Sequence, residues 1–155
     1  MPLFRRVSGI VAVAALVTSL AMAVPASADQ AFHTQHIPLS AVADAPLKSG
    51  AVIDVHTEGP TVYAQERYVL VGVEPGTTYQ VTLLVHTDPA CTALLFPIST
   101  ATMTTNAAGN AHGKATFFPQ DVEGLPRTTY YIEWQVSVQG GAVVYSTGCI
   151  PVMLD

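Results

Sequence analysis

The chain has 155 residues, of which 50% are hydrophobic and 11% are charged, and its formal net charge is −5. This length suits one ordinary domain rather than two. The charge excludes a nucleic-acid-binding protein that relies on a strong positive field, and the hydrophobic fraction excludes a chain that is disordered for lack of core residues.

The first 28 residues have the pattern of a signal peptide. Arg5 and Arg6 form a short positive region, an apolar stretch follows, and Ala26-Ser27-Ala28 supplies the small residues that signal peptidase accepts. We expect cleavage after Ala28, by the general secretory route or by the twin-arginine route. The remaining chain would have a net charge of −7 and no apolar stretch long enough to span a bilayer. The sequence therefore predicts a secreted, extracellular bacterial protein with no membrane attachment after cleavage.

Strand patterns dominate the remainder of the chain. Residues 29–48 are polar and contain prolines, which is typical of an N-terminal arm or a first edge strand, and residues 49–155 form the predicted domain. Within that domain seven stretches have the alternation or the β-rich composition of strands: residues 51–55, 63–73, 79–85, 98–105, 111–118, 130–138 and 142–147. Prolines fall between these stretches, where their missing N–H does least harm. We predict an all-β fold of about seven to eight strands in two antiparallel sheets.

The clearest of these stretches is 130–138. Tyr130, Ile132, Trp134, Val136 and Val138 alternate with polar or smaller neighbours, which predicts a strand whose apolar face, including Trp134, lies in the core. Gly140-Gly141 follows, and glycine tolerates the positive φ of tight hairpin turns. A hairpin is therefore expected between this strand and residues 142–147.

Two cysteines, Cys91 and Cys149, follow the signal peptide. An isolated even pair in an oxidising compartment predicts one disulfide. Neither cysteine has a CxxC partner or a nearby histidine, so we favour the structural role over metal binding or nucleophilic catalysis.

One segment resembles a known family. Val73-Glu74-Pro75-Gly76-Thr77-Thr78-Tyr79, followed by a strand from Gln80, resembles the tyrosine corner of fibronectin type III and other immunoglobulin-like domains, in which the tyrosine hydroxyl bonds back to the backbone. The order of this turn, Cys91, a Thr-rich strand and an Asn/Gly turn is similar to the secreted immunoglobulin-like apoproteins of the neocarzinostatin type, which carry enediyne chromophores. Those proteins have two disulfides, whereas this chain can form one. The resemblance implies an immunoglobulin-like β-sandwich.

Histidines are the first candidates for chemistry. His56 and His86 fall on the predicted polar faces of two strands and would converge if those strands paired, with Asp54 and Asp88 two residues away from them. Such a set would suit a surface site for zinc or copper. The alternative is that both are solvated surface histidines, and we expect no metal and no other cofactor.

Outward aromatic side chains are the candidates for a ligand face. Tyr131 and Tyr145 are expected to share the outer face across the hairpin, and Phe118 is expected to be exposed, because one ring of Phe117-Phe118 must point outward. Tyr130, Trp134 and the other phenylalanine are assigned to the core.

We expect no catalytic residues, because the sequence contains no nucleophile with an identifiable base and no marked pair of carboxylates. The sequence favours a small, secreted, non-catalytic binding or interaction module, whose partner is an extracellular protein or a small ligand and not a nucleic acid. A small-ligand carrier or a protease inhibitor of immunoglobulin-like fold is the alternative, and a surface metal-binding protein or an enzyme comes last. A pocket between the sheets would favour the carrier, and a protruding, disulfide-braced loop around Cys91 would favour the inhibitor.

Overall fold

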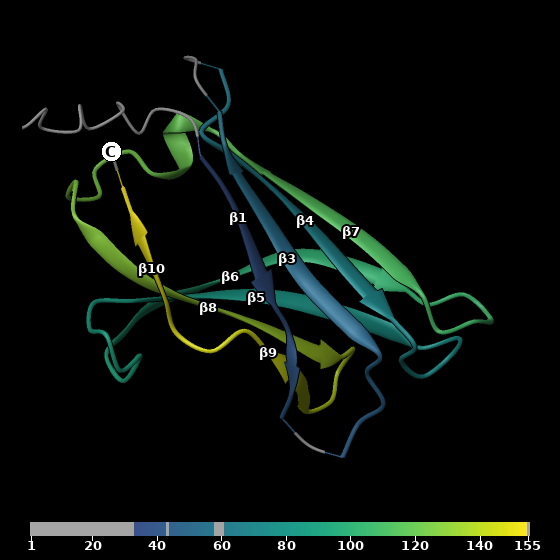
Figure 1. The fold of residues 1–155 in the computed structure, drawn as a ribbon. Helices are drawn as coiled ribbons and strands as arrows, with labels where there is room; N and C mark the ends of the chain where they lie inside the picture. Colours follow the sequence, from purple (N-terminus) through teal and green to yellow (C-terminus); the bar gives the residue numbers. More distant parts are fainter. Residues whose placement is uncertain (1–32, 43, 58–60, 155) are drawn as a thin grey trace, which may run out of the picture.

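The structure is a computed structural model that describes residues 33–42, 44–57 and 61–154. The expected signal peptide and its cleavage site lie outside the described residues. The chain forms two antiparallel β-sheets, which Figure 1 shows as two layers. In the described ranges, the only helical element is a single 3₁₀ turn, η1 (Pro119–Asp121), and no helix is long and apolar enough to cross a membrane. The prediction of an all-β antiparallel fold is confirmed.

The first sheet contains four strands in the order β1–β3–β4–β7. These are β1 (His33–Pro38), β3 (Ser49–His56), β4 (Ala64–Val71) and β7 (Ala111–Phe117). β1 comes from the proline-containing segment before the predicted domain and lies at one edge, where it pairs with β3. β7 forms the opposite edge.

The second sheet follows the order β2–β9–β8–β5–β6, and β10 also pairs with β8. These strands are β2 (Ser40–Ala41), β5 (Thr78–His86), β6 (Leu94–Thr104), β8 (Thr129–Val138), β9 (Val143–Ser146) and β10 (Ile150–Met153). β9 and β10 follow one another along the same edge of β8, so they act as one strand with a break at residues 147–149. Thr147 bridges the break: its backbone N–H donates to the carbonyl of Trp134, and its Oγ1 accepts the backbone N–H of Trp134, both at 3.1 Å.

All seven predicted strand regions contain a strand, but the described residues form ten strands rather than seven or eight. The additional strands are β1, β2 and β10. β2 has two residues and β10 has four, including a proline, so neither is long enough to show alternation. The chain crosses from the first sheet to the second between β1 and β2, at the buried Leu39.

The predicted hairpin between β8 and β9 is confirmed. The Gly141 N–H donates to the carbonyl of Val138 at 2.8 Å, and Gly140 has a φ of +73°, in the region that favours glycine. A bulge between Val136 and Ser137 shifts the register of this hairpin.

The core lies between the sheets and contains Trp134, which is 1% exposed, so its predicted inward orientation is confirmed. Tyr130 is also buried, and Phe117 packs against the core while Phe118 is exposed, as expected. The other large, fully buried side chains are Tyr68, Tyr79, Tyr145, Leu70, Val52, Val81 and Val136.

A tyrosine hydroxyl bonded back to the backbone occurs at the start of β8. The Tyr130 hydroxyl donates to the carbonyl of Pro126 at 3.1 Å. The sequence resemblance had placed this feature at Tyr79, which is buried at the start of β5 with its ring tilted against that of Tyr145.

Candidate functional site

Two polar side chains of β3 face the second sheet. Asp54 is 2% exposed and His56 is 5% exposed, whereas Ile53 and Val55 lie half-buried on the outer face. The expectation that His56 occupies a solvated polar face is therefore wrong. The sequence could not fix the phase of this strand, because apolar residues stand at consecutive positions from 51 to 53 and pairing with β1 and β4 decides which face turns inward.

β4 adds a second buried carboxyl group. Glu66 is 3% exposed and lies directly opposite Asp54 across the β3–β4 pair. The Tyr68 hydroxyl donates to Oε2 of Glu66, and Nε2 of His56 lies 3.2 Å from Oδ2 of Asp54. Asp54, His56 and Glu66 are called the polar cluster below.

The environment of Glu66 places its titration near neutral pH. The pKa of Glu66 is raised to about 7, mainly because the carboxyl group is buried. The charge of Asp54 also raises this pKa. The hydrogen bond from Tyr68, the indole N–H of Trp134 and the charge of His56 lower it. Burial also raises the pKa of Tyr68, so its phenol remains a proton donor to Glu66. With a pKa of about 7, Glu66 is present in both its protonated and its ionised form near neutral pH.

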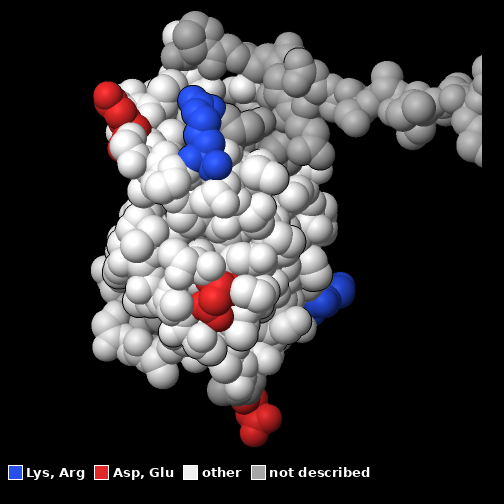
Figure 2. Space-filling view, turned by 90° about the vertical axis from the view of Figure 1, so that its left-hand side faces the viewer, with Lys and Arg blue, Asp and Glu red and all other residues white. Residues whose placement is uncertain are grey.

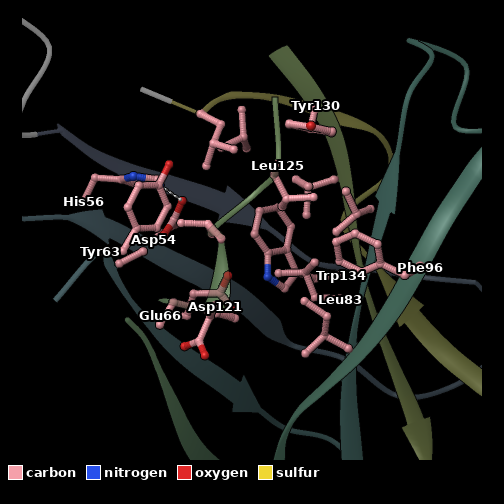
Figure 3. A pocket seen from close by; sticks show the side chains of 18 residues that line it. Asp54, His56, Tyr63, Glu66, Leu83, Phe96, Asp121, Leu125, Tyr130 and Trp134 are labelled. Carbon is pink, nitrogen blue, oxygen red and sulfur yellow. Dashed lines mark hydrogen bonds and ion pairs between the residues drawn. The ribbon is translucent and has the colours of Figure 1, made fainter. Parts of the chain in front are cut away.

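The polar cluster forms part of the wall of a pocket of about 100 Å³ between the sheets. In Figure 3 the cluster lies on one side of the pocket, while Trp134 and Leu83 lie on the other. Most of the remaining wall is apolar, and the segment after β7 contributes Asp121, whose exposure shows that the pocket reaches the surface there. The other lining residues are Tyr63, Ala64, Val85, Phe96, Ile98, Phe117, Val122, Leu125, Tyr130, Ile132, Val152 and Leu154.

Two buried polar atoms in this wall have no hydrogen-bond partner among the described residues. They are Oδ1 of Asp54 and Nε1 of Trp134. The Trp134 N–H is close enough to Glu66 to favour its charged form, but its geometry falls short of a hydrogen bond. A buried polar group without a partner costs about 1–3 kcal/mol, so a bound group that satisfied either atom would gain affinity.

His86 does not join His56. It belongs to β5 in the second sheet, so the strand pairing that would have brought the two histidines together does not occur. His86 is buried rather than solvated, and neither ring nitrogen has a hydrogen-bond partner in the described part of the chain. Asp88 accepts a hydrogen bond from the backbone N–H of Ala93 within its own loop. Residues 33–42, 44–57 and 61–154 contain no group of three or more metal-ligating side chains placed to hold an ion.

The three aromatic residues of the predicted ligand face do not lie on one face. Tyr145 is fully buried on the inner side, opposite Val136, because a bulge at Val144 in β9 shifts the register of the hairpin. Its hydroxyl donates to the carbonyl of Pro46 at 2.7 Å. Tyr131 is half-buried in β8, and Phe118 is 41% exposed next to η1. The prediction that Tyr145 shares an outer face with Tyr131 is wrong.

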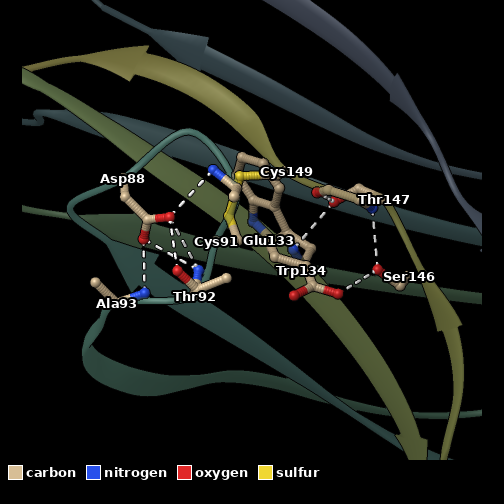
Figure 4. The surroundings of a disulfide bond; sticks show 11 residues. Asp88, Cys91, Thr92, Ala93, Glu133, Trp134, Ser146, Thr147 and Cys149 are labelled. Carbon is tan, nitrogen blue, oxygen red and sulfur yellow. Dashed lines mark hydrogen bonds between the residues drawn. A yellow bond between two sulfur atoms is a disulfide. The ribbon is translucent and has the colours of Figure 1, made fainter.

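The predicted disulfide between Cys91 and Cys149 is present, with a Cα–Cα distance of 5.8 Å. It joins the loop between β5 and β6 to the break between β9 and β10, and therefore spans β8 (Figure 4). Asp88 organises this loop by accepting the N–H groups of Ala90, Thr92 and Ala93 and the hydroxyl of Thr92. These bonds, with that from Ala93 the largest contribution, lower the pKa of Asp88.

Sequence reasoning did not identify Glu66 or the Trp134 N–H as parts of a site. A signal for Glu66 was present, because it shares the phase of Ala64, Tyr68 and Leu70 along β4 and is the one charged residue in that apolar series. The Trp134 N–H gave no signal, because a core tryptophan and a pocket tryptophan look the same in the sequence.

No protein-family model, no curated protein and no solved structure matches this chain.

Proposed function

We propose that this chain is a secreted, non-catalytic carrier that holds a small, mainly apolar ligand between its two sheets. The observation that carries the proposal is the pocket between the sheets, which is apolar over most of its wall and has the polar cluster at one place. Ligand sites generally combine an apolar lining with a few polar groups that fix orientation.

A binding role fits the chemistry of the wall better than catalysis. The lining residues include no serine, threonine, cysteine or lysine among the described part of the chain, so the Asp54–His56 pair has no such nucleophile to activate. The two carboxyl groups are 2% and 3% exposed, which puts them out of reach of a large substrate such as a sugar chain.

We also propose that the fold is an immunoglobulin-like sandwich. The orders β3–β4–β7 and β5–β8–β9 correspond to strands A–B–E and C–F–G of that fold, with β8 in the place of strand F. The hydroxyl of Tyr130 bonds back to residue 126 at the start of β8, which is where the tyrosine corner lies in such domains. β1 would then be an additional edge strand.

Secretion is supported by two independent features. The signal-peptide pattern ends at Ala28, and the Cys91–Cys149 disulfide is typical of proteins from oxidising compartments. The intact mass of protein from the culture medium would show whether cleavage follows Ala28.

Native mass spectrometry of protein purified from the medium of its own producing cells tests the carrier proposal. We expect a bound small molecule, and we expect Val152→Phe to lose it because the larger side chain fills the pocket. Val144→Phe is the matched control, since Val144 is also partly buried but does not line the pocket. Protein without bound ligand that also fails to bind toluene in an NMR titration would contradict the carrier proposal.

A protease inhibitor is the second candidate, and the loop at 87–93 favours it. This loop protrudes at one end of the molecule (Figure 1) and is held by the disulfide and by Asp88. An inhibitory loop must be rigid to avoid paying ordering entropy on binding. We would expect inhibition of a secreted protease that Asp88→Ala weakens, whereas no inhibition across serine and cysteine proteases would remove this candidate.

A further inference from the structure

Two carboxyl groups line the pocket, and no lysine or arginine of the described residues lies beside them. Asp54 and Glu66 are directly opposed across β3 and β4, and directly opposed like charges destabilise a strand pair. The four basic residues of the described chain, Lys48, Arg67, Lys114 and Arg127, are all exposed, and none of them lines the pocket. The face shown in Figure 2 likewise carries only scattered charged side chains. Within the polar cluster, only His56 can offer a positive charge.

The carboxylate oxygens of the polar cluster also outnumber the hydrogen-bond donors around them. One carboxylate oxygen of Asp54 is matched by His56, and one of Glu66 is matched by Tyr68. Oδ1 of Asp54 is buried and has no partner among the described residues. A ligand that brings an N–H donor with a positive charge would satisfy this oxygen and reduce the repulsion between the two carboxyl groups.

The remaining wall suits the other part of such a ligand. Leu83, Val85 and Ile132 provide aliphatic surface, and Phe96 and Trp134 provide aromatic rings that can contact a ring or a cation. The volume of about 100 Å³ limits the enclosed part to a group near the size of one ring.

We propose that the ligand of the pocket is a small amine with an apolar body, whose ammonium group binds between Asp54 and Glu66. This inference rests on the proposed carrier function and specifies the ligand class of the same site. The indole N–H of Trp134, which is also unpartnered in the described residues, provides a donor for an oxygen or a π system on the ligand.

The pH dependence of binding follows from the protonation of Glu66. An ammonium group binds the ionised carboxylate, and the pKa of Glu66 is raised to about 7, so affinity for the amine should rise by up to about thirtyfold between pH 5.5 and 8. The other ionisable groups around Glu66 are Asp54, His56, Tyr63, Tyr68, Tyr130 and Asp121.

Benzylamine, benzyl alcohol and benzoate form a matched set of probes, because they have one ring and similar size but positive, neutral and negative charge. We expect calorimetric or NMR titrations at pH 7.5 to give the affinity order benzylamine, benzyl alcohol, benzoate, with at least tenfold between the first two. Glu66→Gln should bring benzylamine close to benzyl alcohol and remove most of the pH dependence. Glu133→Gln is the control, because Glu133 is on β8 outside the pocket and should leave all three affinities unchanged.

The outcomes separate the two proposals. Equal binding of benzylamine and benzyl alcohol, blocked by Val152→Phe, would overturn the amine inference and retain the carrier. Absence of binding by all three probes and by toluene would overturn both. Should Glu66→Gln fail to fold, the comparison of the three probes on the unmodified protein still decides the question.

Discussion

Asp54 and Glu66 are polar residues of the proposed ligand site, and burial of each is costly for folding. Both are buried on the inner face of the first sheet, where an apolar side chain would avoid the loss of hydration. Local hydrogen bonds from His56 and Tyr68 offset part of this cost. Oδ1 of Asp54 has no hydrogen-bond partner in the described chain, so part of the cost remains, and the proposed amine ligand would offset it.

Replacing Glu66 by glutamine should change how stability depends on pH. The folded pKa of Glu66 is about 7 and its ordinary value is 4.5, so the folded protein binds more protons than the unfolded chain between these values. Its stability therefore falls as pH rises from about 4.5 to 7, by up to about 3 kcal/mol. Glu66→Gln should lack this loss and be more stable than the unmodified protein at pH 8.

Urea denaturation at several values between pH 4.5 and 8 measures this difference. Glu133→Gln serves as the control, because its side chain is half-buried on the outer face, where its Oε1 accepts the Ser146 hydroxyl. If the free energy of unfolding changed with pH in the same way for Glu66→Gln and the unmodified protein, ionisation of Glu66 would cost the folded state little.

Trp134 links the core to the pocket. Replacement by alanine should lower the free energy of unfolding by about 3–5 kcal/mol, the usual range for truncation of a buried aromatic residue. Trp134→Phe should cost much less, because it keeps most of the ring volume and removes the unpartnered N–H. An unchanged denaturation midpoint for Trp134→Ala would place the side chain outside the core.

At the scale of elements, the break between β9 and β10 organises one edge of the second sheet. Thr147 completes the backbone bonds of Trp134 across the break, and Cys149 anchors the loop that follows β5. The disulfide thus connects the two strands that flank β8 and constrains the strand that carries Trp134.

Removal of the disulfide should destabilise the domain. Its two cysteines are 58 residues apart, and closure of a loop of this length stabilises by about 4 kcal/mol in the chain-entropy model. We expect Cys91→Ala/Cys149→Ala to fold with a lower melting temperature, measured by circular dichroism. The unmodified protein treated with reductant should behave in the same way; a double variant with unchanged stability would show that the loop is already ordered without the bond.

For the whole molecule, the division into two sheets decides which distant residues can cooperate. His56 in the first sheet and Glu66 beside it share the pocket with Trp134 and Leu83 of the second sheet. His86 belongs to the second sheet and is not among the residues that line this pocket. The pocket is therefore a product of the packing of one sheet on the other.

Zinc or copper should not bind tightly to this protein. Catalytic and structural zinc sites use at least three protein ligands, whereas His56 and His86 lie in different sheets. We expect calorimetric titration to show no micromolar binding. Binding at that level, abolished by His56→Ala/His86→Ala, would restore the metal hypothesis.

The sequence by itself determined the features that depend on neighbouring residues. Alternation or β-rich composition predicted the seven main strands, Gly140-Gly141 predicted the hairpin turn, and the two cysteines could pair only with each other. These follow from local periodicity, from the conformational freedom of glycine and from counting. The inward orientation of Trp134 followed as well, because its strand is apolar on one face alone.

Tertiary structure alone decided the phase of β3, the burial of Tyr145 and the composition of the pocket. β3 has apolar residues on both faces, so packing between strands selects the face that turns Asp54 inward. A single bulge at Val144 in β9 places Tyr145 opposite Val136 on the inner face, and no local pattern marks that bulge. The pocket joins residues from both sheets, and their distances are set by sheet packing, which alternation along one strand does not encode.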